Sequence, residues 1–209
     1  MQRLIERGDS IRLVKNRVCR GPSGALRTGF AEARAARVLV VMADQCDDHS
    51  QIGQLLALVP AQADIACPSR YCPGGAQLMG PSLKVFIPRF AGWLMRLLTG
   101  VATHDPTNSF KLYNSEVLTT FPLRSTVSFS VTLEVVAKAH CLGYRVTEIP
   151  TTWRDRRAGQ SNFPLARSVV TYMPWFLVLL LRNRLFRLPR SWLRKWLGVP
   201  APNVSSRTA

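Results

Sequence analysis

A short apolar run that ends in three carboxylates constrains the fold of this chain more than any other segment. Residues 38–42, Val-Leu-Val-Val-Met, have the composition of a strand covered on both faces, because they show no polar alternation. Asp44, Asp47 and Asp48 follow directly, at the expected carboxyl edge of a sheet, where open α/β sheets bind their ligands. These oxygen ligands predict a Mg²⁺ or Mn²⁺ ion that bridges nucleotide phosphates. The alternative is an acidic turn that caps the next helix.

The rest of the chain alternates between strand-like and helix-like segments, which predicts an α/β fold with a mostly parallel sheet. The expected strands are 11–15, 38–42, 64–67 and 145–149, and the expected helices are 25–34, 51–59, 82–99 and 131–142. Pro88 interrupts the third helix, and Gly143 is expected to cap the fourth. Glu134 in that fourth helix is either a partly buried orienting carboxylate or a solvent-facing residue. The pattern predicts one domain over residues 1–163.

The charge of the chain is strongly basic and uneven. Lys and Arg total 28 against 12 Asp and Glu, which gives a net charge of +16, and no acidic residue follows Asp155. Such a basic surface attracts polyanions, either lipid headgroups or nucleic acid. Nucleic acid explains the charge but not the acidic cluster, so we expect no nucleic-acid partner. The five cysteines show no paired metal spacing and indicate reduced thiols of a cytoplasmic protein.

The C-terminal segment, residues 164–209, has the pattern of amphipathic helices and a basic tail at a membrane surface. Fourteen uncharged residues run from Ser168 to Leu181. As a helix they reach about 21 Å, which is short of the ~30 Å hydrocarbon core of a bilayer. The basic run that follows contains leucines, Trp192 and Trp196, as helices in the membrane interface do. We therefore expect peripheral attachment at the cytoplasmic face of a membrane; the alternative is a core helix with a solvated tail.

Five segments carry a resemblance that covers about residues 11–180. They are the loop and helix over 16–30, Met-Ala-Asp-Gln-Cys-Asp-Asp over 42–48, Ser-Arg-Tyr-Cys-Pro-Gly-Gly over 69–75, Asp-Pro-Thr-Asn-Ser-Phe-Lys-Leu-Tyr over 105–113, and the strand over 143–150 with the loop over 155–163. In this order they resemble family 2 glycosyltransferases, which have the Rossmann-like GT-A fold. More narrowly, they resemble the polyprenyl-phosphate sugar transferases typified by dolichyl-phosphate mannose synthase.

The resemblance implies inverting transfer of a sugar from a GDP- or UDP-linked donor to a polyprenyl (dolichyl or undecaprenyl) phosphate. It implies that Asp44, with Asp47 or Asp48, holds the Mg²⁺ or Mn²⁺ ion that neutralises the diphosphate leaving group. Implied catalytic residues are Asp44, Asp105 and Arg156, and implied substrate-binding residues are Arg70, Lys84, Arg89, Lys111, Arg156 and Ser161. Because the second pKa of a phosphate monoester is about 6, the acceptor is already nucleophilic at pH 7, and the site needs cations rather than a strong base.

The chain departs from the family's pattern at three places. The family's first two strands, which form the pocket for the nucleotide base, are not found here, so the resemblance implies an N-terminally truncated domain. Met42 replaces the first Asp of the metal motif, and Met is no ligand for Mg²⁺. Pro88 replaces a Ser before Arg89. These departures leave an alternative function, a catalytically impaired fragment or a non-catalytic, membrane-associated remnant of such an enzyme.

Overall fold

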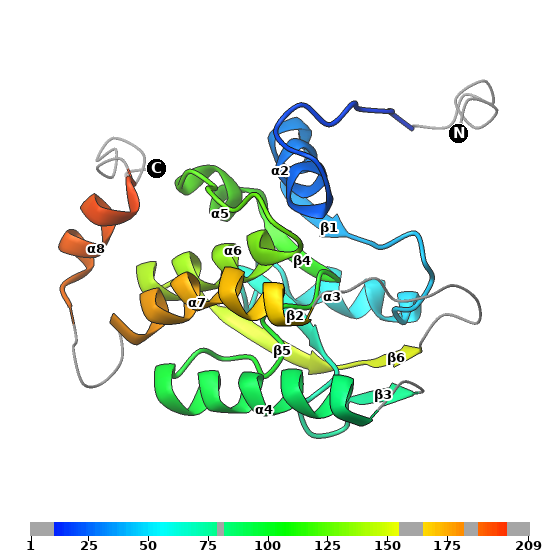
Figure 1. Cartoon of the computed structure of the whole chain (residues 1–209). Coiled ribbons are helices and arrows are strands. Elements are labelled where there is room, and N and C mark those ends of the chain that lie inside the picture. The colour runs from blue at the N-terminus through cyan, green and yellow to red at the C-terminus, as the bar shows by residue number, and fades with distance from the viewer. Residues whose placement is uncertain (1–10, 79–81, 155–164, 182–187, 200–209) are drawn as a thin grey trace.

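A four-stranded sheet forms the centre of the computed structural model, which describes residues 11–78, 82–154, 165–181 and 188–199 (Figure 1). The order across the sheet is β1 (Arg37–Val40), β4 (Lys111–Asn114), β2 (Ile65–Ser69) and β5 (Val146–Pro150). β4 is antiparallel to β1 and to β2, whereas β2 and β5 are parallel. β1, β2 and β5 therefore point the same way. Their carboxyl ends meet at one edge, where β3 (Ala76–Leu78) and β6 (Thr152–Arg154) add a small parallel pair.

Helices cover both faces of this sheet, because alternate residues of each strand point to opposite sides. Ile65 and Cys67 belong to the larger core, with α6 and parts of α2, α7 and α8, and Ala66 belongs to a smaller core with α3. The helices are α2 (Pro22–Glu32), α3 (Ile52–Leu58) after the 3₁₀ turn η1 (His49–Gln51), α4 (Ser82–Thr99), α5 (Ser115–Thr120), α6 (Ser130–Leu142), α7 (Leu165–Leu181) and α8 (Arg190–Leu197).

The central helix α6 is buried at every residue except His140, because the sheet, α2, α7 and α8 surround it. Its Glu134 is fully buried and accepts hydrogen bonds of 2.7 Å from the backbone N–H groups of Arg124 and Ser125. Lys138 pairs with the same carboxylate at 2.6 Å. The structure thus decides between the two expectations for Glu134: it is a buried carboxylate, and it orients the loop before α6. Gly143 caps the helix in the left-handed region, as expected.

The α/β fold class is confirmed, while several expected elements need correction. Residues 11–15 form no strand: no other strand pairs with them in the described part of the chain, and Leu13 is 65% exposed. β1 is not covered on both faces, because Val40 is its one buried residue and Arg37 is exposed; it also lies at the side of the sheet, with one neighbour among the described strands. α2 begins at Pro22 rather than at Ala25, since proline is well suited to the first helical position. The sheet is mixed, because the unexpected strand β4 inserts between β1 and β2.

The apolar helix α4 and the C-terminal helices, of which only the latter were expected at a membrane, differ in what they contact. α4 has the predicted bounds, but Phe86, Phe90, Trp93 and Leu97 on its apolar side lie in water, and Phe86 and Leu97 are each 63% exposed. α7 and α8 instead bury Val178, Leu179, Leu193 and Leu197 in the same core as α6. None of the helices in the described ranges combines the length and hydropathy needed to cross a bilayer.

Candidate active site

The predicted site residues gather where β1, β2 and β5 end and the antiparallel strand β4 begins. Asp44 and Asp47 follow β1, Arg70 follows β2, and Asp105 lies six residues before Lys111, the first residue of β4. Because β4 runs opposite to its neighbours, its amino end lies beside their carboxyl ends. The mixed topology thus places segments that are distant in sequence around one edge of the sheet.

Arg70 and Asp105 form a bidentate ion pair at the centre of this edge. Arg70 Nε donates to Asp105 Oδ2 at 2.6 Å and Arg70 Nη2 donates to Oδ1 at 3.0 Å, while the backbone N–H of Arg70 donates to Oδ2 at 3.3 Å. Burial opposes ionisation of Asp105, but the facing guanidinium outweighs it and lowers the pKa of the carboxyl. The tight turn after Arg70 needs Gly75, since a Cβ there would lie 2.4 Å from the carbonyl oxygen of Ser69. The pair fixes the Asp105 segment against the end of β2.

Lys111, which was expected to bind a phosphate, is fully buried beneath the Asp105 segment. Its Nζ donates to the backbone oxygens of Asp105, at 3.3 Å, and of Asn108. Asn108 Nδ2 in turn donates to the carbonyl oxygen of Pro68 at 3.0 Å. Burial lowers the pKa of the Lys111 ammonium. In this arrangement Lys111 supports the loop that carries Asp105, and its charge reaches the site without direct exposure.

Asp47 is the carboxylate that best fits a divalent cation. Burial and the negative charge of Asp44 raise the pKa of Asp47 to about 6, and its Oδ1 is buried without a hydrogen-bond partner among the described residues. A buried carboxylate oxygen of this kind is stabilised by a positive ion. The described residues contain no group of three or more His, Cys, Asp and Glu side chains placed to hold a metal. Asp44 and Asp47 match the one or two carboxylates that an ion such as Mg²⁺ takes from a protein, the rest of its ligands being phosphates and water.

Asp48, the third predicted metal ligand, has the capping role that was the alternative. Its Oδ1 accepts hydrogen bonds from the backbone N–H of Ser50 at 3.1 Å and from the Ser50 hydroxyl at 2.6 Å. The hydroxyl is the main reason that the pKa of Asp48 is lowered. Asp48 thus caps η1, and the structure brings Asp44 near Asp47 rather than near Asp48.

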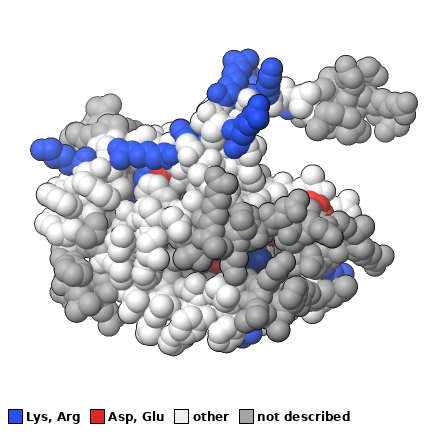
Figure 2. Space-filling model, viewed as in Figure 1, with Lys and Arg blue, Asp and Glu red and all other residues white. Residues whose placement is uncertain are grey.

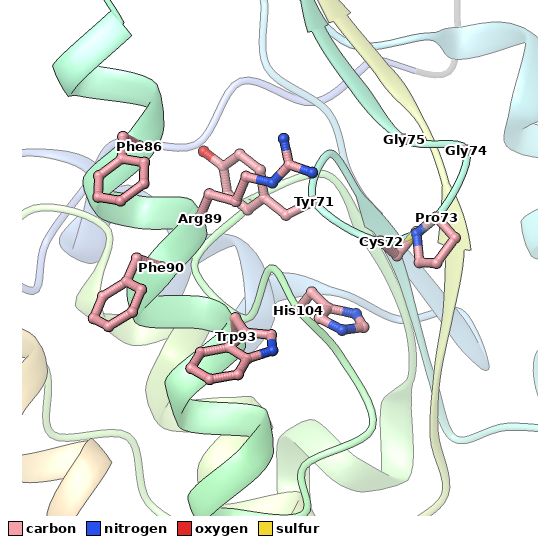
Figure 3. A pocket seen from close by; sticks show the side chains of 10 residues that line it. All are labelled: Tyr71, Cys72, Pro73, Gly74, Gly75, Phe86, Arg89, Phe90, Trp93 and His104. Carbon is pink, nitrogen blue, oxygen red and sulfur yellow. The ribbon is translucent and has the colours of Figure 1, made fainter.

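A pocket of about 470 Å³ lies between α4 and the loop that follows Arg70 (Figure 3). Its lining includes Arg89 and His104 together with Tyr71 and Cys72 of the loop. Arg89 has an exposed side chain, and no ion pair is found for it among the described residues. On the other side, Phe86, Phe90 and Trp93 of α4 line the pocket and are also exposed to solvent. The arrangement suits an amphiphile with an anionic head, because an exposed guanidinium and an apolar wall share one opening.

Three predicted residues cannot be compared with the structure. Arg156 and Ser161 lie outside the described residues, and Lys84 belongs to α4 but its side chain is also outside the described part.

Two site residues were missed from the sequence. His104 lies next to Asp105 and lines the pocket, and Glu148 of β5 holds its ring. The adjacency of His104 to the Asp105 motif was the signal that could have found it.

Comparison with known sequences assigns the chain to a family. The model of the family described as Glycosyl transferase family 2 matches residues 1–121. The chain therefore belongs to glycosyl transferase family 2, as the motifs suggested.

Three similar proteins of this family have names that refer to polyprenyl-type phosphates. The chain is 33% identical over 140 residues to the polyprenol monophosphomannose synthase of Mycolicibacterium smegmatis, covering 66% of this chain and 51% of the relative. It is 28% identical over 163 residues to the undecaprenyl-phosphate mannosyltransferase of Micrococcus luteus, covering 74% and 67%. It is 25% identical over 173 residues to the dolichol-phosphate mannosyltransferase of Pyrococcus furiosus, covering 79% and 48%. The chain thus spans about half the length of two of these relatives and two thirds of the other.

A solved structure confirms the fold. The glucosyl-3-phosphoglycerate synthase of Mycobacterium tuberculosis, crystallised with uridine diphosphate, matches with a TM-score of 0.55 and 15% identity. The match covers 96% of this chain and 65% of that one. At this level of identity the likeness concerns the GT-A fold alone.

Proposed function

We propose that this chain transfers a hexose from a nucleotide sugar to the phosphate of a polyprenyl lipid, at a membrane surface and with a divalent cation. One observation carries the proposal: a site built on Asp47 and the Arg70–Asp105 pair adjoins a pocket that combines Arg89 with the exposed aromatic side of α4. The three relatives support the same acceptor class, since their names refer to polyprenol, undecaprenyl and dolichol phosphates. GDP- and UDP-linked sugars are both candidate donors.

The reaction proposed is a single displacement with inversion. An oxygen of the acceptor phosphate attacks the anomeric carbon, and the bond from that carbon to the nucleoside diphosphate breaks, so that the diphosphate leaves with the electron pair. Mg²⁺ or Mn²⁺ held by Asp44 and Asp47 would supply charge neutralisation for the leaving diphosphate. Arg89 is placed to bind the acceptor phosphate, and the Arg70–Asp105 pair keeps the loop behind it rigid. Holding two anions in contact is the main task of such a site.

The membrane contact is assigned to α4 and the exposed side of α7. Phe86 stacks on Phe90 with centroids 6.1 Å apart, and Phe90 stacks on Trp93 at 5.8 Å, although all three rings face solvent. α7 packs beside α4 and exposes Val170 and Met173. Exposed apolar side chains in one continuous patch mark an interaction surface. None of the five cysteines forms a disulfide with another, which supports a location on the reducing, cytoplasmic side of the membrane.

On the face shown in Figure 2, most of the visible basic side chains lie away from α4. Figure 2 shows them gathered toward α8 and toward the segment before α2, while mostly uncharged atoms cover the region of α4. The proposed contact therefore depends on apolar insertion at α4 more than on attraction of the basic helix α8 to lipid headgroups.

Transfer can be tested with radiolabelled GDP-mannose and UDP-glucose and with vesicles that contain undecaprenyl phosphate or dolichyl phosphate. We expect labelled lipid with one of the donors, dependent on Mn²⁺ or Mg²⁺, abolished by EDTA and reduced by Asp44→Ala. Glu116→Gln at the exposed start of α5 is the matched control for loss of one carboxylate. A chain that makes no labelled lipid with any pairing, yet floats with the vesicles, would support the non-catalytic alternative instead.

The membrane contact needs its own test, because transfer and attachment can fail separately. Phe90→Ser with Trp93→Ser should abolish flotation of the chain with vesicles, since it removes two exposed rings from one patch. Leu56→Ser on α3, where the leucine is also exposed, is the control and should float like the native chain. If the double substitution leaves flotation unchanged, the membrane contact lies outside α4.

A further inference from the structure

A histidine held by a carboxylate lines the pocket beside Arg89. His104 Nδ1 lies 2.7 Å from Glu148 Oε1, and the backbone N–H of His104 donates to Glu148 Oε2 at 2.8 Å. The His104 side chain is 18% exposed, and its ring borders the same space as Arg89 and Cys72 (Figure 3). The ring is therefore fixed on one edge and open to the pocket on the other.

Contacts with α4 hold this pair in place. Glu148 belongs to β5 and also accepts from Arg96 of α4, at 3.3 Å. Gly92 of α4 lies so close to the His104 segment that a Cβ there would be 1.9 Å from the carbonyl oxygen of His104. A histidine whose Nδ1–H donates to a carboxylate has a defined tautomer, and its Nε2 is then the atom that meets a ligand. Glu148 thus acts as a positioning residue for the His104 ring.

Apart from Arg89, the other ionisable groups described around His104 are either neutral or already paired. Burial raises the pKa of Cys67 and of Tyr71 to about 12 and raises that of Cys72, so these groups stay protonated at neutral pH. Asp105, the next residue along the chain, is neutralised by Arg70. The charged groups that face the His104 ring are Glu148 of β5 and, from α4, Arg89 and Arg96. Among the described residues, Arg89 is the guanidinium of this pocket for which no ion pair is found, and it attracts an anion into the space that His104 also lines.

We propose that His104 is a second residue that binds the phosphate monoester of the acceptor, and that it shares one proton with that phosphate. The inference rests on the proposed function, in which Arg89 receives the same phosphate. Imidazoles and phosphate monoesters lose their protons in the same pH range. When the monoanion enters, its P–O–H proton passes to Nε2, which leaves a dianion as the nucleophile and an imidazolium between it and Glu148. When the dianion enters, the imidazole takes the proton from solvent, and the same complex results.

Proton uptake is therefore the measurement that distinguishes this role from simple packing. Farnesyl phosphate is a suitable probe, because it carries the isoprenoid phosphate in a short chain, and farnesol lacks the phosphate. Calorimetric titration at pH 8 in Tris and in HEPES, which differ in ionisation enthalpy, reports the protons taken up on binding. We expect about one proton per farnesyl phosphate for the native chain, since one acidic proton is shared in the complex.

Two substitutions divide the functions of the ring. His104→Asn keeps a donor near the Nδ1 position for Glu148 but has nothing at Nε2. It should fold normally, take up no proton and bind farnesyl phosphate about tenfold more weakly, the effect of losing one charge-assisted hydrogen bond. His104→Gln reaches the Nε2 position with an amide and should recover part of the affinity without the proton uptake. Arg89→Gln should weaken binding while retaining the uptake. His140→Asn, at the end of α6, is the control and should match the native chain.

The outcomes separate this inference from the proposed function. If His104→Asn binds farnesyl phosphate with native affinity and native proton uptake while Arg89→Gln binds it weakly, the role of His104 is overturned and the acceptor site stands. If the native chain binds farnesyl phosphate no better than farnesol, both proposals are overturned.

Discussion

The Arg70–Asp105 ion pair predicts both the stability of the chain and the way that stability depends on pH. The Asp105 side chain is fully buried, and that of Arg70 is 16% exposed. Replacing Arg70 with Gln leaves a buried carboxylate without its cation. Because removal of one partner from a buried pair costs about 3–5 kcal/mol, we expect Arg70→Gln to lower the free energy of unfolding by this amount at pH 7.

The contribution of Asp105 to the pH dependence of the unfolding free energy should have opposite signs in the native chain and in Arg70→Gln. In the native chain Arg70 outweighs burial and lowers the pKa of Asp105, so the stabilisation is present above the unfolded-state pKa of about 3.9 and is lost as the pH falls through the folded value. In Arg70→Gln burial dominates, so the folded-state pKa lies above the unfolded one. Stability is then lost as the pH rises above about 4. The difference between the two proteins should therefore widen between about pH 4 and pH 7.

Urea unfolding followed by tryptophan fluorescence tests this for Arg70→Gln, Asp105→Asn and the double variant. Asp105→Asn should cost less, about 2 kcal/mol, because the Arg70 guanidinium can still reach water. The double variant should be more stable than the sum of the single effects by about 2 kcal/mol, the coupling of two contacting groups. Additivity within about 0.5 kcal/mol, or a difference that stays constant with pH, would refute the role of this pair.

Three further predictions concern other parts of the site. Asp47→Asn should raise the free energy of unfolding by about 1–2 kcal/mol at pH 8 and by little at pH 4. The reason is that the pKa of Asp47 is raised to about 6, so its ionisation is unfavourable in the folded chain. In thermal unfolding scans, Mn²⁺ should stabilise the native chain and not the variant. Gly92→Ala should lower the free energy of unfolding by about 1–3 kcal/mol, because its Cβ pushes α4 away from the His104 carbonyl. Gly29→Ala in α2, whose Cβ would meet open space, should raise it by about 0.5–1 kcal/mol. Equal losses of melting temperature in the two variants would contradict this. Met42→Asp should bind Mn²⁺ severalfold more tightly by calorimetry, since it adds a carboxylate to the metal motif, and unchanged affinity would place the ion elsewhere.

Local pattern was a good guide to the helices and a weaker guide to the sheet. The helix over 82–99 was predicted with its observed bounds, because its apolar spacing is strong and continuous. The expected strand over 11–15 fails although its composition is suitable, since a strand needs a neighbour and none pairs with this segment in the described chain. β4 was missed because four residues that begin with Lys111 and end with Asn114 carry little strand signal. Its place between β1 and β2 depends on contacts distant in sequence.

The site was predicted as a group of residues, but not as a set of contacts. The motifs brought Arg70, Asp105 and Lys111 to one edge of the sheet, and the structure places them there. Whether an acidic residue binds an ion or caps a helix was undecided for Asp48, and the Ser50 hydrogen bonds decided it. Glu148 could not be predicted as a site residue, because its connection with the pocket depends on contacts with α4 and with His104.

The close approach at Gly92 has a consequence for catalysis on a lipid surface. With no side chain at that position, the backbone of α4 touches the segment that carries Asp105, so that a displacement of one is expected to displace the other. In the proposed membrane contact, the depth to which the outer rings of α4 enter a leaflet would then set the height of the reacting groups above the acyl chains. Turnover should accordingly vary with leaflet thickness and curvature at constant acceptor content, because these properties determine how far a headgroup must rise to react.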